Sequence, residues 1–425
     1  MSAQQRALLP ILFIGFITSF SMSTILPFLI YVVEDFRGSE FVWGDIGVVF
    51  GILGATYALF EMIGAPLLGA WSDKIGRKKV LIISHTGSFI SWGIFALAFF
   101  VNPETNTVLG LSLPLFVIFC ARVLDGITGG NIAVANSYLS DITPDDKTSD
   151  SFGQMAAAGG LGFIIGPALS GFLGETSLGY LLPVLVAMGI SGIGLIFLFF
   201  MKDAESVRKD LNLSLEDCHG YVEEQKSTKT TFTEALKIKY IPLLLLLYFL
   251  VYLAFNFFYT AFPVHAEGGL EWSVSQVGVY FATLSSLMFV IQLFVLPRVS
   301  KRVKPVTLIV GGLLILSLYF YLALSENTAI LYLGLVFFAL GNGTMWPSFL
   351  GFMSKVAGPK RQGTIQGYGS SAGAFASVVG LLLGGILYDT IGVYTFLFTA
   401  IGLGVVALIS LYLKNAPQNS ISKES

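Results

Sequence analysis

The sequence is poor in charge, cysteine and histidine. Only 12% of its 425 residues are Asp, Glu, Lys or Arg, whereas soluble domains carry about 25%. The net charge of −2 provides no basic field, so we expect no nucleic-acid partner. Cys120 and Cys218 are too few for a disulfide framework, and the three histidines lack metal-ligand spacing. Walker loops, dinucleotide fingerprints and nucleophile–base sets are missing too, so we expect no cofactor, no metal and no enzymatic activity.

Apolar residues make up 55% of the chain, more than a soluble core can bury, because such cores stop growing near about 250–300 residues. Apolar segments of about 20 residues, the length that crosses a bilayer, recur along the sequence. They predict an all-α membrane protein with twelve transmembrane helices. These helices are expected at residues 8–33, 44–70, 78–100, 112–140, 150–174, 178–201, 240–263, 272–297, 304–325, 328–355, 363–388 and 391–414.

One long polar segment divides these helices six and six. We therefore expect an N-terminal six-helix bundle over 1–201, a cytoplasmic linker over 202–239, and a C-terminal six-helix bundle with a short cytoplasmic tail over 240–425. Lys and Arg concentrate in the linker and in alternate loops, whereas the opposite loops hold Arg37 alone. Because cytoplasmic loops carry the excess of Lys and Arg, this pattern predicts a multi-pass membrane protein with both termini cytoplasmic. The sequence shows no large outer glycosylated loop or cleavable signal, which fits the inner (cytoplasmic) membrane of a bacterial cell, with an organelle membrane as the alternative.

The two halves of the sequence resemble each other. Residues 153–175 align without gaps with residues 367–389, and several glycines coincide. In a second helix pair Glu61 falls on Gln292. Equal spacing in two separate helix pairs predicts two pseudo-symmetric bundles. Internal repeats with the binding site at their interface are typical of secondary transporters.

The strongest local motif is GAWSDKIGRKKVL, between the second and third expected helices. It resembles the gate loop of the major facilitator superfamily, with Gly69, Asp73, Gly76, Arg77 and Lys78 in register. The resemblance implies the major facilitator fold and a loop that pins the cytoplasmic gate in the outward-open state. Asp73 can face a helix N-terminus, where the dipole favours an anion, and Arg77 can connect it to Asp141. The alternative is a basic hairpin without a gating role.

A second motif lies in the fifth expected helix. GQMAAAGGLGFIIGPALSG is similar to the motif of proton-coupled drug antiporters, on Gly153, Gly162, Gly166, Pro167 and Gly171. Ser170 departs from the pattern, since the family has glycine there. With RVLDGITGGNIAVANSYLSDIT in the fourth helix, the chain resembles the tetracycline-resistance branch of these antiporters. The resemblance places this helix between the two halves. Glycine-rich faces also occur in membrane helices without an antiport role.

Three ionisable residues other than histidine lie well inside the expected helices: Glu61, Arg122 and Asp125. Burying Arg or Asp at a helix centre costs about 2.5–3.5 kcal/mol on insertion scales, so such residues are functional by default. Arg122 and Asp125 share a helix face and can pair. A carboxyl such as Glu61 can exchange a proton when its access to water changes. We therefore expect proton coupling through these three residues.

Two alternatives stay open for these charges: a purely structural ion pair, and a protonated Glu61 that only hydrogen-bonds. The resemblance implies a coupling role for Arg122. Relatives of the tetracycline branch commonly carry a neutral amide at position 61 and an acidic residue in helix 1, so this chain departs from them. His85, near the cytoplasmic end of the third helix, is interpreted as a packing residue rather than a proton relay.

The second half is expected to supply the walls of the solute cavity. Tyr252, Asn256 and Tyr259 recur at helical spacing in the seventh helix, and Asn342 and Trp346 lie in the tenth. Gln292 is added as the neutral counterpart of Glu61. An aromatic pocket with scattered amides suits a bulky, partly apolar solute. Packing or lipid contact is the alternative for these aromatic rings.

Together these features predict a secondary transporter that works by alternating access and exports a bulky organic solute in exchange for protons. Its expected partners are a small-molecule substrate, protons and the lipid bilayer, and we expect a monomer. The alternatives are a proton-coupled or facilitated importer of a sugar, peptide or organic anion, and, more remotely, a receptor or scaffold that transports nothing.

Overall fold

The computed structural model describes residues 3–37, 45–103, 107–108, 110–129, 131–144, 147–211, 213, 231–358 and 361–415. Over these residues the chain is helical apart from its loops and one short hairpin, in which strand β1 (Thr107–Val108) pairs antiparallel with strand β2 (Leu111–Ser112). Twelve of the described helical segments are long and apolar enough to cross a membrane, which confirms the all-α class and the expected number of spans.

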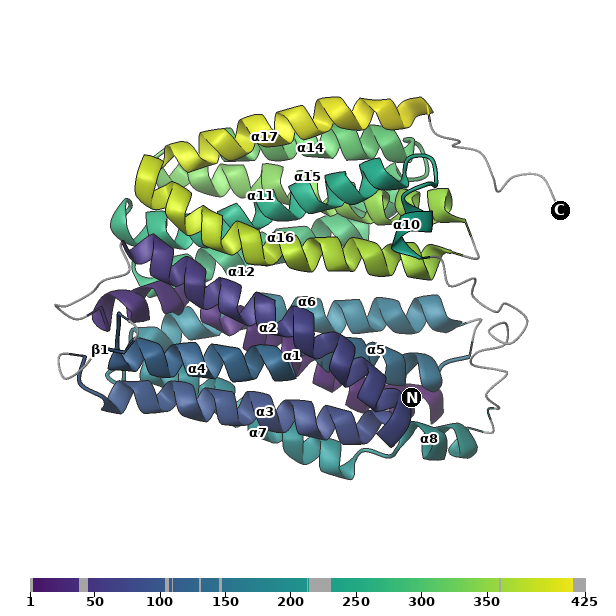
Figure 1. Ribbon diagram of the computed structural model, residues 1–425, viewed down its shortest axis with the longest axis horizontal. Helices are drawn as coiled ribbons and strands as arrows, with labels where there is room; N and C mark the ends of the chain where they lie inside the picture. Colours follow the sequence, from purple (N-terminus) through teal and green to yellow (C-terminus); the bar gives the residue numbers. More distant parts are fainter. Residues whose placement is uncertain are drawn as a thin grey trace. The chain divides into compact units, whose positions relative to one another are not determined.

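By its internal contacts the chain divides into two compact units. The first comprises Met1–Glu224 and Pro263–Ala282, and the second comprises Gln225–Phe262 and Thr283–Ser425. Among the described residues, the helices that belong wholly to the first unit are α1 (Ala3–Asp35), α2 (Ile46–Ile75), α3 (Arg77–Leu97), a 3-10 turn (Ala98–Phe100), α4 (Leu113–Thr128), α5 (Asn131–Asp141), α6 (Thr148–Gly174), α7 (Leu181–Phe200) and the short α8 (Ala204–Asp210). Figure 1 shows α1 to α8 following one another in purple to teal.

Two long helices of the second half contribute residues to both units. In α11 (Ile241–Gly268) the division falls at Pro263, inside the helix, and in α12 (Val274–Val290) it falls after Ala282. The remaining helices of the second unit are α10 (Phe232–Ala235), a π-helical turn (Ile291–Val295), α13 (Leu296–Val299), α14 (Pro305–Leu322), α15 (Thr328–Ala357), α16 (Gln362–Ile391), α17 (Tyr394–Ser410) and a final 3-10 turn (Leu411–Asn415) (Figure 1).

One expected helix is interrupted. The segment predicted as a single helix over 112–140 ends as α4 at Thr128 and begins again as α5 at Asn131. At Gly129, between them, a Cβ atom would lie only 3.0 Å from the Asp125 carbonyl oxygen and from the Tyr57 hydroxyl. Glycine at this point therefore lets neighbouring groups approach the backbone more closely than a side chain would allow.

Glycines bring α6 into close contact with α1. A Cβ at Gly162 would lie 2.6 Å from the Phe16 carbonyl oxygen, and one at Gly166 would lie 3.0 Å from the Phe20 carbonyl oxygen. Ser23 Oγ donates a hydrogen bond to the Gly162 carbonyl oxygen across 3.1 Å. Close backbone approach of this kind stabilises membrane helix pairs through dispersion, since lipid supplies little hydrophobic drive for association.

The second unit repeats this arrangement. Gly373 and Gly380, which align with Gly159 and Gly166, pack on α11 in the way that the first pair packs on α1. A Cβ at Gly373 would meet the ring of Tyr248 at 2.7 Å, and one at Gly380 would meet the Asn256 Cβ at 2.7 Å. The internal repeat seen in the sequence therefore corresponds to equivalent helix contacts in the two units.

An apolar cluster closes one end of the first unit, where α1, α3, α5, α7 and α8 meet. Its larger buried members include Ile11, Leu81, Tyr138, Leu198 and Val207. Tyr138 lies in α5, and its hydroxyl donates a hydrogen bond of 2.7 Å to the Lys202 carbonyl oxygen. The cluster and this hydrogen bond thus hold the residues that directly follow α7 against the bundle.

Replacing Gly162 by Ala is expected to lower the stability of the protein. The new methyl group would collide with the α1 backbone, and overpacking of this kind costs about 1–3 kcal/mol. Gly153→Ala, in the same helix, is the matched control, because nothing lies within 4 Å of its Cβ position. Thermal unfolding of both variants in detergent should show a lower midpoint for Gly162→Ala alone. Equal midpoints would contradict the close α1–α6 contact.

Candidate functional site

Helices α2 and α4 cross in backbone contact at the centre of the candidate site. A Cβ at Gly126 of α4 would lie 2.7 Å from the Tyr57 carbonyl oxygen, and a Cβ at Gly64 of α2 would overlap the backbone of Ile127. Both glycines leave the two helices free to approach. The crossing brings Tyr57 and Glu61 of α2 to the same place as the charged residues of α4.

The expected pair of Arg122 and Asp125 is present. Arg122 Nη1 lies 3.3 Å from Asp125 Oδ2, and the two side chains are only 11% and 18% exposed. The guanidinium carbon of Arg122 lies 4.4 Å from the centre of the Tyr57 ring, within the range of a cation–π interaction. Arg122 Nε is buried and has no hydrogen-bond partner among the described residues. Arg122 is thus fixed between a carboxylate of its own helix and an aromatic ring of α2.

Glu61 belongs to the same cluster. The Tyr57 hydroxyl, one helical turn earlier on α2, is its hydrogen-bond partner, and Glu61 lies near enough to Asp125 and Arg122 for their charges to act on it. Ser88 of α3 is hydrogen-bonded to Asp125. Two carboxyl groups therefore face a single guanidinium inside a membrane-spanning bundle. The spacing of four residues between Tyr57 and Glu61 was the signal in the sequence that could have identified Tyr57.

The gate motif forms a network of ion pairs around Arg77. Its Nε lies 3.1 Å from Asp141 Oδ2, its Nη1 lies 2.5 Å from Asp73 Oδ1, and Nη1 also donates to Ser72 Oγ across 2.6 Å. Asp73 pairs with Arg77, one turn away, and its side chain is 64% exposed. Gly76 has φ of +98°, a conformation that disfavours residues with a side chain.

Two further contacts tie this loop to the end of α7 and to α8. Lys78 Nζ donates to the Phe199 carbonyl oxygen across 3.1 Å. Arg208 of α8 donates to the Asp141 carbonyl oxygen across 3.2 Å, so Asp141 receives one arginine on its side chain and another on its backbone. Nothing in the sequence motif pointed to Arg208.

The glycine motif of α6 has different surroundings along its length. Gly153 has open space at its Cβ position, and Gly162 and Gly166 face α1. At Gly171 a Cβ would lie 2.9 Å from the Val274 carbonyl oxygen and 3.1 Å from Gly278 Cα, at the start of α12. A Cβ at Gly278 would in turn overlap the Pro167 carbonyl oxygen. The last part of the motif therefore packs against the first turns of α12, within the first unit.

In the second unit, aromatic rings of α11 and α15 pack together. The rings of Tyr252 and Trp346 lie 5.0 Å apart, and both contact Tyr248, which the sequence did not single out. Tyr248 stacks on Tyr252 at 5.1 Å with an interplanar angle of 7°. Tyr259, two turns after Tyr252 on α11, contacts Phe258. The structure thus brings Tyr252 and Trp346 into direct contact.

The expected amides of the second unit have unlike environments. Asn256 Nδ2 donates to the Tyr252 carbonyl oxygen and to Ser377 Oγ, at 2.7 and 3.1 Å. Asn342 Nδ2 approaches Met288 Sδ at 3.7 Å, and its Oδ1 is buried without a partner among the described residues. Gln292 lies exposed in the π-helical turn. Short π-helical segments occur frequently at functional sites.

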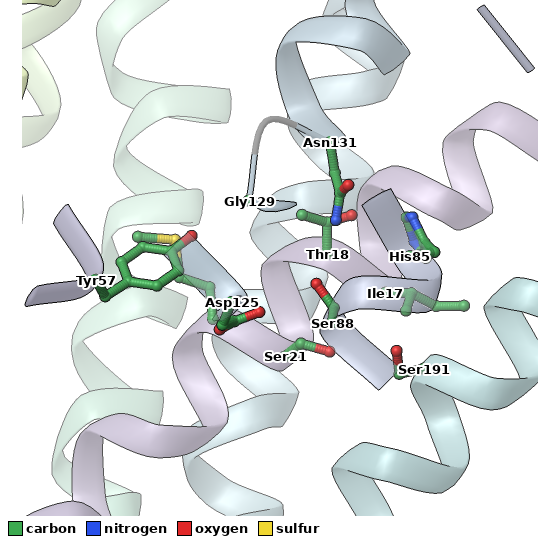
Figure 2. Close-up of a pocket in the computed structure, with 11 residues that line it drawn as sticks. Ile17, Thr18, Ser21, Tyr57, His85, Ser88, Asp125, Gly129, Asn131 and Ser191 are labelled. Carbon is green, nitrogen blue, oxygen red and sulfur yellow. The ribbon is translucent and has the colours of Figure 1, made fainter. Parts of the chain in front are cut away.

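A small cavity with several polar side chains in its lining adjoins the charged cluster in the first unit. Figure 2 shows Asp125 and Tyr57 at one side of it and His85 and Asn131 at the other. Hydroxyl groups of Thr18, Ser21, Ser88 and Ser191 complete its polar lining. Sequence reasoning missed this cavity, because its residues come from α1, α2, α3, α4, α5 and α7.

Twelve apolar helices long enough to span a membrane, with repeated packing and a buried charged cluster, define a multi-pass membrane protein. The sequence model of the Major Facilitator Superfamily matches residues 11–380 and, in a second match, residues 244–425. The chain belongs to the Major Facilitator Superfamily, a family of transporters rather than enzymes.

Individual relatives agree with this assignment. The chain is 29% identical to the class B tetracycline resistance protein of Escherichia coli over 97% of both chains. It is 26% identical to multidrug resistance protein 2 of Bacillus subtilis over 86% of both chains. Among solved structures, the inward-open xylose transporter XylE from Escherichia coli matches with a TM-score of 0.75 and 14% identity, over 98% of this chain and 97% of that one. The last likeness shows the fold alone.

Asp125→Leu is expected to destabilise the protein, because it removes the carboxylate that is ion-paired with the buried Arg122. Breaking a buried ion pair from one side costs about 3–5 kcal/mol. The double variant Arg122→Met, Asp125→Leu should recover much of this loss, because it removes both charges of the pair together. Unfolding midpoints of the wild type, both single variants and the double variant give the coupling free energy. Additive effects would show that the two side chains do not depend on each other.

Proposed function

We propose that the chain exports a bulky, partly apolar organic solute in exchange for protons. The observation that supports this most directly is the charge count of the α2–α4 cluster. Among the residues that the structure describes, Glu61 and Asp125 together face the single guanidinium of Arg122, so the cluster carries one carboxyl more than this guanidinium can neutralise. An unpaired carboxylate is unfavourable at membrane depth, and one proton removes the excess charge.

Coupling then follows from alternating access. If the cluster meets water in one conformation and is closed from it in another, proton binding favours the closed form. A proton can shift this equilibrium only by its difference in affinity for the two conformations. Arg122 helps to produce that difference, because its contacts with Tyr57 and Asp125 depend on how α2 and α4 are packed.

The solute site is proposed to involve the aromatic group of the second unit. Tyr252 and Trp346 provide apolar faces, and Tyr259, Asn256 and Asn342 provide polar groups nearby along α11 and α15. Such a lining suits a solute that is largely apolar with a few polar groups. Gln292, the neutral counterpart of Glu61 in the second half, is proposed to add a further polar group to this solute site.

The names of the relatives favour export over import. Both are called resistance proteins, one for tetracycline and one for several drugs. We propose the same direction of transport here, and we leave the identity of the solute to a panel of compounds. The rival function is import of a sugar, peptide or organic anion, with Arg122 as the anion ligand.

The halves over 1–201 and 240–425, joined by the linker 202–239, are proposed to move against each other in a monomer. Both termini are assigned to the cytoplasm because Lys and Arg gather on that side, which is the side of the Gly69–Lys78 loop. In a bacterial cell the corresponding location is the inner membrane. The Arg77 network would then stabilise one conformation of a cytoplasmic gate.

Glu61→Gln tests the proposal in proteoliposomes with a pH-sensitive dye. Glutamine keeps the shape of the side chain and a hydrogen bond to Tyr57 but cannot exchange a proton, so solute-dependent proton movement should disappear. Glu326→Gln, at an exposed position before α15, is the control and should behave like the wild type. Proton movement that survives in Glu61→Gln would shift the coupling role to Asp125. Solute movement without any proton signal in the wild type would rule out proton coupling.

Arg77→Gln tests the gate. Losing the contacts to Asp73, Asp141 and Ser72 should lower the exchange rate by about tenfold, which corresponds to roughly 1.4 kcal/mol, while equilibrium binding of the solute changes little. Lys79→Gln, in the same loop and exposed, is the matched control. Equal exchange rates in the two variants would argue against a gating role for the Arg77 network.

A further inference from the structure

The cavity beside Asp125 is large enough for water. It offers about 30 Å³ of space that water can occupy, whereas one water molecule needs roughly 10–15 Å³. About two water molecules therefore fit by this measure. Of the groups that line it, only Tyr57, His85 and Asp125 are ionisable.

Two buried polar atoms at the cavity lack a hydrogen-bond partner among the described residues. Asn131 is 4% exposed and its Oδ1 has none. His85 is 1% exposed, and its Nδ1 makes no hydrogen bond of good geometry, although the Leu81 carbonyl one turn earlier lies near enough to interact. Burying a polar group without a hydrogen-bond partner is unfavourable. Water in the cavity would satisfy both atoms.

The break between α4 and α5 lies at the same place. Gly129 and Asn131, on either side of the break, both line the cavity (Figure 2). At the end of α4, Ser84 donates a hydrogen bond to the Thr128 carbonyl oxygen. The first N–H groups of α5 have no acceptor within their own helix and call for one outside it.

We propose that ordered water in this cavity connects Asp125 to His85, and that His85 serves as a second proton carrier beside the Glu61–Arg122–Asp125 cluster. A proton released by the Asp125 carboxyl passes to the nearest water, which gives one of its own protons to an imidazole nitrogen, and the reverse transfer restores both groups. Ser88 lies between the two groups, because it is hydrogen-bonded to Asp125 and is one turn from His85 on α3. The inference rests on the proposed proton coupling.

Apolar side chains cover His85 on the side of the gate loop. Leu81, one turn before His85 on α3, belongs to the buried apolar cluster with Ile11, Tyr138 and Leu198. This apolar layer separates the cavity from the gate loop at Arg77. A proton on His85 is thus held inside the bundle until the layer opens, which prevents a continuous leak.

A single-histidine protein tests the hydration directly. The chain has three histidines, so His219→Gln with His265→Gln leaves His85 as the only one. Water-edited ¹⁵N NMR of this protein in lipid should show transfer from water to the His85 ring, and filling the cavity by Asn131→Leu should abolish the transfer. A ring that receives no magnetisation from water and keeps one neutral form from pH 5 to pH 9 would overturn the proposal.

Transport measurements separate this inference from the proposed function. In proteoliposomes His85→Phe and Asn131→Leu should each slow solute-dependent proton movement about tenfold or more, the factor given by a barrier increase of roughly 1.4 kcal/mol. His85→Gln, which retains polarity but cannot carry a proton, should flatten the pH profile, and His265→Gln should leave it unchanged. Coupled transport that persists unaltered in all His85 and Asn131 variants overturns the relay alone. A wild type that moves solute without protons overturns the proposed function, and the relay with it.

Discussion

Direct contact between helix backbones is the constraint on which the other features of this protein depend. In lipid, helices gain little by burying apolar surface against each other, so they must approach closely enough for dispersion to stabilise the pair. Gly64 and Gly126 permit this between α2 and α4, and Gly162 and Gly166 permit it between α6 and α1. The short separation at the first crossing is what allows the ring of Tyr57 to reach Arg122 on the neighbouring helix.

The charged residues inside the first unit differ in how far neighbouring groups balance their charge. Arg122 is balanced by Asp125 and by the Tyr57 ring, whereas Glu61 has only the hydroxyl of Tyr57 and the field of its neighbours. The least compensated group in such a cluster responds most readily to a change in its surroundings. Because Asp125 and the Tyr57 ring already interact with Arg122, Glu61 is the group of this cluster whose charge is least balanced.

The sequence predicted the spans well, because a run of apolar residues has the same meaning wherever it lies in a membrane protein. It also predicted contacts within one helix or between recognised motifs, such as Arg122 with Asp125 and Arg77 with Asp141. It did not predict Tyr248 or the cavity that lies between Asp125 and His85. These depend on how each helix is rotated about its axis, and apolar residues on every face of a helix leave that rotation undefined.

Helix α8 packs on the first unit as part of it, although it follows the last membrane helix of that half. Val207 is buried in the same apolar cluster as Leu198, and Arg208 holds the carbonyl end of α5. A half-length polypeptide that stopped at the last membrane helix would leave this cluster uncovered and the α5 terminus without its arginine. A split transporter assembled from two separately expressed chains should therefore be divided after α8, so that the first fragment carries the helix that covers its own apolar cluster.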